Sequence, residues 1–275
     1  MRAKKSLGQN FLTDERVVDR IVGELAPRAD ETIIEIGPGR GALTSRLIEK
    51  AGRLVAVEFD RDLVPVLRQR FAAHENFKLI EADALATNFC EVIEPASSAR
   101  VVANLPYYIS TAILQHLIAY RGCLTEMVLM LQREVVERLT APPGASERGF
   151  LSVLIEAYCE AEILFDVAPG SFRPVPKVWS TVVRLRMRPH IAVEVKEEAL
   201  LWQTVSAGFA QRRKTIFNNL RGAAGDLRSR LEMKGGARRA LEAARIEPQR
   251  RAETLSLEEW ARLARILEEV PGDSR

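Results

Sequence analysis

The 275-residue chain has few of the side chains that most often bind transition metals or form cross-links, with only three cysteines and three histidines. The cysteines are odd in number, far apart and without metal-ligand spacing, at Cys90, Cys123 and Cys159. We therefore expect them to be reduced thiols in the core or at the surface. The histidines are equally scattered. The sequence thus predicts neither a metal site nor a catalytic histidine.

Long apolar segments are also missing. The chain has no run of 18 consecutive apolar residues, and its basic first five residues are not followed by an apolar segment. We therefore expect no membrane segment and a cytoplasmic location. Apolar residues make up 47% of the chain, which is enough to build the cores of one large domain and a smaller one.

Charge is unevenly distributed along the chain. The net charge is +3, but residues 181–275 contain 19 Lys and Arg against 13 Asp and Glu, whereas the remainder contains 21 against 24. A basic surplus at one end of a chain is typical of a protein with a polyanionic partner.

The segment TIIEIGPGRGALT at residues 32–44 joins a short apolar run to three glycines and a helical pattern. Its β-branched residues predict a strand buried on both faces, and the glycines predict a tight turn into a helix. The free N–H groups of a helix N-terminus favour a negatively charged or polar ligand, so a nucleotide-like ligand is the first hypothesis. Two alternatives stay open. One is a dinucleotide-binding turn in which alanine stands in place of the third glycine, and the other is a purely structural turn.

Two further predicted strands end near an acidic residue. Glu58 follows the glycines at the distance where α/β folds hold the ribose hydroxyls, although an ordinary strand-end carboxylate is the alternative. The carboxylate of Asp83 can accept a hydrogen bond from an adenine amino group, and the N–H of the neighbouring Ala84 can serve a ring nitrogen. Because ligands of open α/β sheets bind outside the carboxyl ends of the strands, we expect one cofactor crevice here.

A fourth predicted strand leads into Asn104, Leu105, Pro106 and Tyr107. The exocyclic amine of adenine is a poor nucleophile because its lone pair is delocalised into the ring. The Asn104 side-chain oxygen and the backbone carbonyl next to Pro106 can accept its two N–H bonds and aim the lone pair. Tyr107 can stack on a base that has left its helix. The alternative is a plain turn with a packed aromatic ring.

Seven segments together resemble the ribosomal RNA adenine N6,N6-dimethyltransferases, which are class I methyltransferases that use S-adenosylmethionine. The segments are KSLGQNFL (5–12), EIGPGRGALT (35–44), EADAL (81–85), NLPY (104–107), LQREVV (131–136), FRPVPKV (172–178) and QRRKT (211–215). They are spread over nearly the whole chain and are specific in combination, whereas the glycine turn alone is not.

The resemblance implies roles for the matching residues. Asn10 and Leu12 are expected to close over the cofactor, and Gly37, beside Gly39, to lie against its amino-acid part. Glu58 takes the ribose and Asp83 the adenine. Asn104 contacts both the cofactor and the target amine.

The resemblance also implies the substrate. It is the 16S rRNA of the small ribosomal subunit, in which two adjacent adenosines in the loop of the 3′-terminal hairpin are each methylated twice, late in assembly. Phe172 is a candidate for a second aromatic wall of the base pocket, with core packing as the alternative. The chain departs from the family at Tyr108, where Asn is common, and at Trp179, where Asp is common. Both departures affect the expected edge of the base pocket.

Beyond residue 188 the pattern becomes helical. Arg212, Arg213 and Lys214 begin a basic stretch dense enough to neutralise several phosphates, and a solvated face is the alternative. We therefore predict an α/β chain with a Rossmann-like, class I methyltransferase domain over residues 1–188 and a small helical RNA-binding domain over residues 189–275. A monomer is expected.

Three other functions compete with this prediction. The first is a large-subunit RNA adenine methyltransferase that confers macrolide resistance. The second is a non-catalytic RNA-binding assembly factor on the same fold, and the third is a nicotinamide dehydrogenase, which only the glycine pattern supports.

Overall fold

The computed structural model describes residue 4 and residues 7–106 and 109–268. The chain folds as two compact units, one formed by Met1–Val136 with Cys159–Pro189 and the other by Glu137–Tyr158 with His190–Arg275. The sequence analysis placed a single boundary after residue 188 and did not anticipate that residues 137–158 group with the C-terminal helices.

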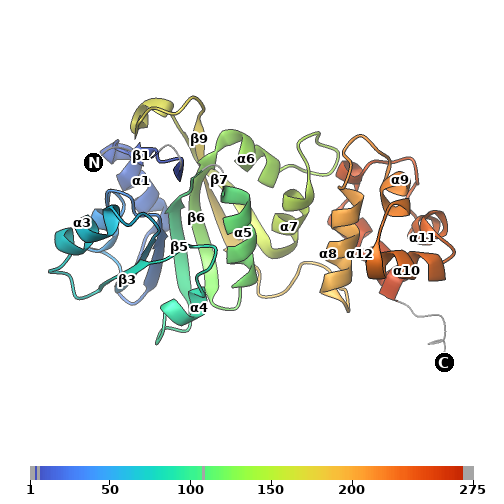
Figure 1. Cartoon of the computed structure of the whole chain (residues 1–275), viewed down its shortest axis with the longest axis horizontal. Helices are drawn as coiled ribbons and strands as arrows, with labels where there is room; N and C mark the ends of the chain where they lie inside the picture. Colours follow the sequence, from blue (N-terminus) through green and yellow to red (C-terminus); the bar gives the residue numbers. More distant parts are fainter. Residues whose placement is uncertain (1–3, 5–6, 107–108, 269–275) are drawn as a thin grey trace. The chain divides into compact units, whose positions relative to one another are not determined.

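Within the described residues, the first unit is built on a seven-stranded sheet with the strand order β4-β3-β2-β5-β6-β9-β7 (Figure 1). The strands are β2 (Thr32–Ile36), β3 (Arg53–Glu58), β4 (Phe77–Glu81), β5 (Ala99–Asn104), β6 (Leu124–Gln132), β7 (Cys159–Val167) and β9 (Ser180–Met187). The first five strands in this order are parallel to one another, whereas β9 is antiparallel to both β6 and β7. The predicted Rossmann-like sheet is confirmed.

The order in which strands are added to the sheet reverses between β2 and β5. From β2 the chain adds β3 and β4 on one side, then returns to add β5 and β6 on the other. All five residues of β2 are buried, as expected for a strand covered on both faces. The carboxyl ends of β2 and β5 therefore flank a topological switch point, where α/β sheets bind their ligands.

Short helices connect these strands and cover the sheet. They are α1 (Glu15–Leu25), α2 (Thr44–Leu47), α3 (Leu63–Arg70), α4 (Phe89–Val92) and α5 (Ser110–Ala119). Helix α1 begins after Asp14, whose side chain accepts a hydrogen bond from the Arg16 N–H, and it buries one apolar stripe. That stripe joins residues from several strands in one hydrophobic core.

The N-terminal segment and the proline-rich loop form a separate antiparallel pair of two short strands. Strand β1 (Phe11–Leu12) lies beside β8 (Phe172–Arg173), with Leu12 opposite Phe172. The turn η2 (Pro169–Ser171) precedes β8, and the Ser171 carbonyl accepts a hydrogen bond from the Thr13 N–H. These bonds fix the position of the N-terminal segment on the sheet domain.

The second unit is helical. It contains α7 (Phe150–Tyr158), α8 (Glu198–Gly208), α9 (Ile216–Arg221), α10 (Gly225–Met233), α11 (Ala237–Ala243), the turn η3 (Ala252–Thr254) and α12 (Leu257–Glu268), and α6 (Arg133–Leu139) crosses from the first unit. Trp260 of α12 is fully buried in its core. Ser256 and Glu259 exchange hydrogen bonds as a capping box at the start of α12.

One prediction about the cysteines is wrong. Cys90 in α4 and Cys123, directly before β6, form a disulfide with Cα atoms 5.7 Å apart, whereas Cys159 is a buried free thiol. The two paired cysteines are 33 positions apart in sequence, and only the fold brings them together.

No helix among the described residues is both long and apolar enough to span a bilayer. No group of three or more His, Cys, Asp and Glu side chains in this part of the chain could hold a metal ion.

The packing around Trp260 generates a stability prediction. A β-carbon added at Gly208 would lie 2.3 Å from Cη2 of Trp260 and 3.0 Å from Cδ1 of Ile216. Because the buried ring would have to move, we expect Gly208→Ala to lower the free energy of unfolding by about 1–3 kcal/mol. Denaturant titration measures this change.

Gly23 in α1 offers a matched control. A β-carbon there would have no heavy atom within 4 Å, so we expect Gly23→Ala to raise the free energy of unfolding by about 0.5–1 kcal/mol. Equal effects of the two substitutions would contradict the packing described for Trp260.

Candidate active site

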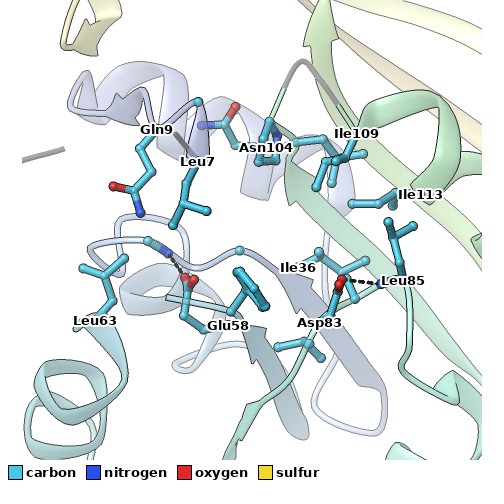
Figure 2. Close-up of a pocket in the computed structure, with 18 of the residues that line it drawn as sticks. Leu7, Gln9, Ile36, Glu58, Leu63, Asp83, Leu85, Asn104, Ile109 and Ile113 are labelled. Atoms are coloured by element: carbon cyan, nitrogen blue, oxygen red, sulfur yellow. Dashed lines mark hydrogen bonds between the residues drawn. The ribbon is translucent and has the colours of Figure 1, made fainter. Parts of the chain in front are cut away.

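A cavity of about 300 Å³ opens at the switch point of the sheet (Figure 2). Its walls come from the carboxyl ends of β2, β3, β4 and β5 and from the N-terminal segment. The polar side chains Glu58, Asp83 and Asn104 line it, each from a different strand end. The cavity volume lies at the lower end of the range for small-molecule sites.

The glycine turn forms one wall. Gly37 and Gly39 both line the cavity and have φ angles of 66° and 60°, in the left-handed region that favours glycine. A β-carbon at Gly37 would have no heavy atom within 4 Å, whereas one at Gly39 would come within 3.1 Å of the Phe11 ring. Gly37 therefore keeps ligand space open, and Gly39 lets the N-terminal segment approach the turn.

Glu58 holds this turn in place. One carboxylate oxygen accepts a hydrogen bond from the Gly39 N–H at 3.1 Å and the other accepts from the Asp60 N–H at 2.8 Å. The side chain is only 6% exposed, and burial raises its pKa although the two backbone N–H groups oppose the shift. Each oxygen has a further lone pair, so the carboxylate can also accept from ligand hydroxyls.

Asp83 and Ala84 line the cavity beyond the end of β4. Oδ1 of Asp83 accepts a hydrogen bond from the Leu85 N–H at 2.9 Å, which fixes the side chain at the rim (Figure 2). The aspartate remains exposed, so its second oxygen can accept from a ligand.

Asn104 lies at the end of β5, and its Nδ2 donates to the backbone carbonyl of Asn10 at 3.1 Å. A carbonyl oxygen only accepts, so the contacting group is the amide NH₂ and the side-chain oxygen Oδ1 faces away from it. Leu105 and Pro106 also line the cavity, and the Leu105 N–H donates to the Met130 carbonyl. Tyr107, like the divergent Tyr108, lies outside the described residues.

The N-terminal segment is held over the cavity by Asp60, a contact that sequence reasoning missed. The carboxylate of Asp60 accepts from Nε2 of Gln9 at 2.7 Å and pairs with the Lys4 ammonium, which also pairs with Asp62. Burial opposes ionisation of Asp60, but the bonds from Lys4 and Gln9 outweigh it and lower the pKa of the carboxyl. Its position two residues after Glu58 was the only sequence signal.

Phe59 is the second residue missed. Its side chain is 58% exposed and lines the cavity between the Glu58 and Asp83 strand ends. An exposed aromatic ring at a cavity wall provides an apolar surface for a planar ligand. The signal was present in the sequence, as an aromatic residue directly after the strand-end acid.

Two predicted site residues lie in the core instead. Phe172 is 1% exposed, which fits the packing alternative rather than an open aromatic wall. Leu12 is 7% exposed and packs in the same core cluster, whereas its neighbour Asn10 lines the cavity.

The predicted RNA-binding residues lie in the second unit, between α8 and α9. Arg212, Arg213 and Lys214 are all exposed. The Arg212 guanidinium donates to the Ser146 carbonyl. Arg213 and Lys214 have no ion-pair partner among the described residues, so their charges are available to a polyanion.

Glu35 lies behind the glycine turn and is almost fully buried, with 1% of its surface exposed. Its carboxylate accepts a hydrogen bond of 2.6 Å from the Thr44 hydroxyl, which connects the end of β2 to the start of α2. Burial raises the pKa of Glu35 to about 7, with the Thr44 bond opposing the shift and the charge of Glu58 adding to it. Sequence reasoning quoted Glu35 in a motif but gave it no role.

Comparisons with known proteins agree with this geometry. A family profile for ribosomal RNA adenine dimethylases matches residues 1–269. The chain is 43% identical over 270 residues to ribosomal RNA small subunit methyltransferase A of Hahella chejuensis, covering 98% of this chain and 94% of that protein. It is 45% identical over 276 residues to the protein of the same name from Chromohalobacter salexigens, covering 98% and 93%.

Two solved structures resemble the chain. The 23S rRNA methyltransferase ErmE is 27% identical with a TM-score of 0.69, over 94% of this chain and 100% of that one. A dimethyladenosine transferase from Plasmodium falciparum is 23% identical with a TM-score of 0.77, over 92% and 95%, and shows the likeness of fold. The predicted class I methyltransferase fold is confirmed.

The buried Glu35 generates a pH prediction. Between its ordinary pKa of 4.5 and the raised value of about 7, the folded protein keeps a proton that the unfolded chain has lost, so stability falls as the pH rises through this window. A glutamine can still accept the Thr44 bond but does not ionise. Relative to wild type, we expect Glu35→Gln to gain up to about 3 kcal/mol in unfolding free energy between about pH 5 and pH 8.

Denaturant titrations over this pH range measure the difference, with Glu75→Gln as an exposed control that should show no such trend. A difference between Glu35→Gln and wild type that stays constant with pH would rule out the buried titration.

Proposed function

This chain belongs to the ribosomal RNA adenine dimethylase family, and we propose that it dimethylates N6 of two adjacent adenosines in the 3′-terminal hairpin loop of 16S rRNA, using S-adenosylmethionine. The relatives named for the small subunit, at 43% and 45% identity over nearly the full chain, favour this substrate over the 23S rRNA of ErmE. The proposal includes a role late in small-subunit assembly, which rests on the resemblance alone.

One observation carries the proposed chemistry. Glu58, Asp83 and Asn104 converge on one cavity from the ends of β3, β4 and β5, although they are distant in sequence. The two carboxylates provide acceptors for a nucleoside, and the amide lies on the other side of β2, where a second base can enter. This arrangement fits a site that binds an adenosine-containing cofactor beside a target adenine.

The residues of the cavity fit S-adenosylmethionine. Glu58 accepts from the ribose hydroxyls, while Asp83 and the Ala84 N–H pair with the adenine edge. Phe59 offers an apolar surface to the ring, and Gly37 leaves room for the amino-acid part. When bound, the cofactor supplies an electrophilic methyl group on a sulfonium sulfur.

Asn104 positions the target amine. Its Oδ1 and the Leu105 carbonyl accept the two N–H bonds of N6, which draws the nitrogen toward tetrahedral geometry and turns its lone pair into the cavity. The proton leaves to water after alkylation, because an alkylated adenine ammonium is strongly acidic. The chain therefore needs no general base at this position.

Methyl transfer from labelled S-adenosylmethionine to small subunits that lack the modification tests the proposal. We expect dimethyladenosine in the 3′-terminal hairpin, identified by nucleoside analysis and mapping. Labelling confined to large-subunit RNA would reject the substrate, and tight binding without transfer would leave only the assembly role.

The role of Asn104 predicts that its removal lowers the rate of methyl transfer much more than the affinity for the cofactor. Removing the acceptor in Asn104→Ala should lower the rate of methyl transfer by about 100-fold or more, in the range found when a group that acts in the transition state is lost. Calorimetry should find that S-adenosylmethionine affinity falls by less than about tenfold, since Glu58 and Asp83 remain. Comparable losses in both quantities would contradict the assigned role.

The exposed side chains of Arg213 and Lys214 predict that binding to small subunits weakens as the salt concentration rises. The double substitution Arg213→Ala with Lys214→Ala should weaken binding to unmodified small subunits and lower the slope of log affinity against log salt by about two. Arg228→Ala with Arg265→Ala removes the same charge from residues that already pair with Glu232 and Glu258, so its slope should stay near wild type. Equal slopes for the two double variants would indicate a solvated face at residues 212–214.

A further inference from the structure

Trp179 differs from the other two tryptophans of the chain in its exposure. Trp260 is fully buried, and Trp202 donates its indole N–H to the Tyr158 hydroxyl. Trp179 is 46% exposed, and its neighbours Val175 and Val178 are 56% and 40% exposed. The proline-rich loop therefore presents an apolar surface with an aromatic ring, while its other ring, Phe172, is buried.

One face of the Trp179 ring is supported by an anchored cation. The Arg133 guanidinium lies 5.1 Å from the ring centroid, and the Arg133 N–H donates to the Trp179 carbonyl at 3.0 Å. The guanidinium also pairs with Asp166, whose other oxygen accepts from the Thr181 hydroxyl at 2.6 Å. The ring is thus fixed in orientation, which lowers the entropy cost of stacking a ligand on it.

The strand register places this ring relative to Asn104. Asn104 of β5 lies opposite Met130 of β6, and β6 pairs in turn with β9 so that Gln132 lies opposite Ser180. Trp179 therefore lies at the same carboxyl edge as Asn104, two strands across and about three residues further along. With ordinary strand spacing and rise, this separation is roughly 14 Å between Cα atoms.

The side of Asn104 on which Trp179 lies matters as much as its distance from Asn104. In the strand order β4-β3-β2-β5-β6-β9, the cofactor residues lie at the ends of strands on one side of β5, whereas Trp179 lies on the other side, directly before β9. Trp179 is not among the residues that line the cavity. Its ring is therefore placed toward the substrate side of Asn104.

The loop carries the charge that a nucleic acid requires. Between Asp166 and Glu194 the sequence contains five Lys and Arg and no acidic residue. Arg184, Arg186 and Arg188 pair with glutamates of neighbouring strands, whereas Arg173 and Lys177 are exposed and have no acidic partner among the described residues. An exposed aromatic ring with unpaired cations in the same loop is the usual platform for single-stranded nucleic acid.

We propose that Trp179 stacks on an unpaired nucleobase of the substrate RNA that flanks the adenosine held at Asn104. The inference rests on the proposed RNA substrate and adds a contact on the side away from the cofactor. Arg173 and Lys177 hold the adjoining phosphates, and the ring reads no particular base, because every base has a face that can stack.

The affinity of Trp179 variants for unmodified small subunits tests this contact. Loss of one stacked base should make Trp179→Ala about tenfold weaker in equilibrium binding, whereas Trp179→Phe, which keeps a ring, should stay within about threefold of wild type. Val178→Ala removes exposed apolar surface from the same loop without removing a ring, so it should bind as wild type does. S-adenosylmethionine affinity should be unchanged in all three variants.

Ultraviolet cross-linking of the wild-type complex, with the linked peptides mapped by mass spectrometry, identifies what the ring touches. We expect a nucleotide attached to the peptide that contains Trp179. Equal affinities of wild type and Trp179→Ala, or a cross-link from this peptide to a ribosomal protein only, would overturn the inference. Absence of methyl transfer by the wild-type protein would instead reject the proposed function, whatever the variants do.

Discussion

The candidate site depends on one hydrogen bond, from the Gly39 N–H to the buried carboxylate of Glu58. It connects the turn after β2 to the end of β3, so two walls of the cavity have a common support. The second Glu58 oxygen binds the N–H of Asp60, whose side chain in turn holds Gln9 of the N-terminal segment. A single buried acid therefore positions the glycine turn and, through Asp60, the N-terminal segment that reaches Asn104.

The sheet and most of the cavity could be predicted from the sequence because both depend on local patterns. A β-branched run followed by glycines can hardly form anything other than a buried strand and a tight turn. Once the strands are parallel, their carboxyl ends must meet at one edge, so Glu58, Asp83 and Asn104 could be grouped before any coordinates were known. The structure brings all three to one cavity.

The disulfide, the division into units and the buried position of Phe172 depend on contacts between segments far apart in sequence. The Cys90–Cys123 disulfide joins a helix to the start of a strand, and residues 137–158 belong to a unit whose other residues come after residue 189. Phe172 was ambiguous because aromatic residues serve equally in cores and in binding walls. Its pairing with Leu12, which decides between these roles, is a tertiary contact with no local signal.

The contact between Asn104 and residue 10 places an unusual constraint on the N-terminal segment. The acceptor is the main-chain carbonyl of Asn10, not its side chain, and Leu12 is fixed opposite Phe172 only two residues later. This hydrogen bond therefore does not depend on which side chain occupies position 10, but it does depend on residue 10 lying directly before β1. Insertion or deletion of one residue there would offer Asn104 a different peptide group, so this hydrogen bond constrains the length of the segment more strictly than its composition.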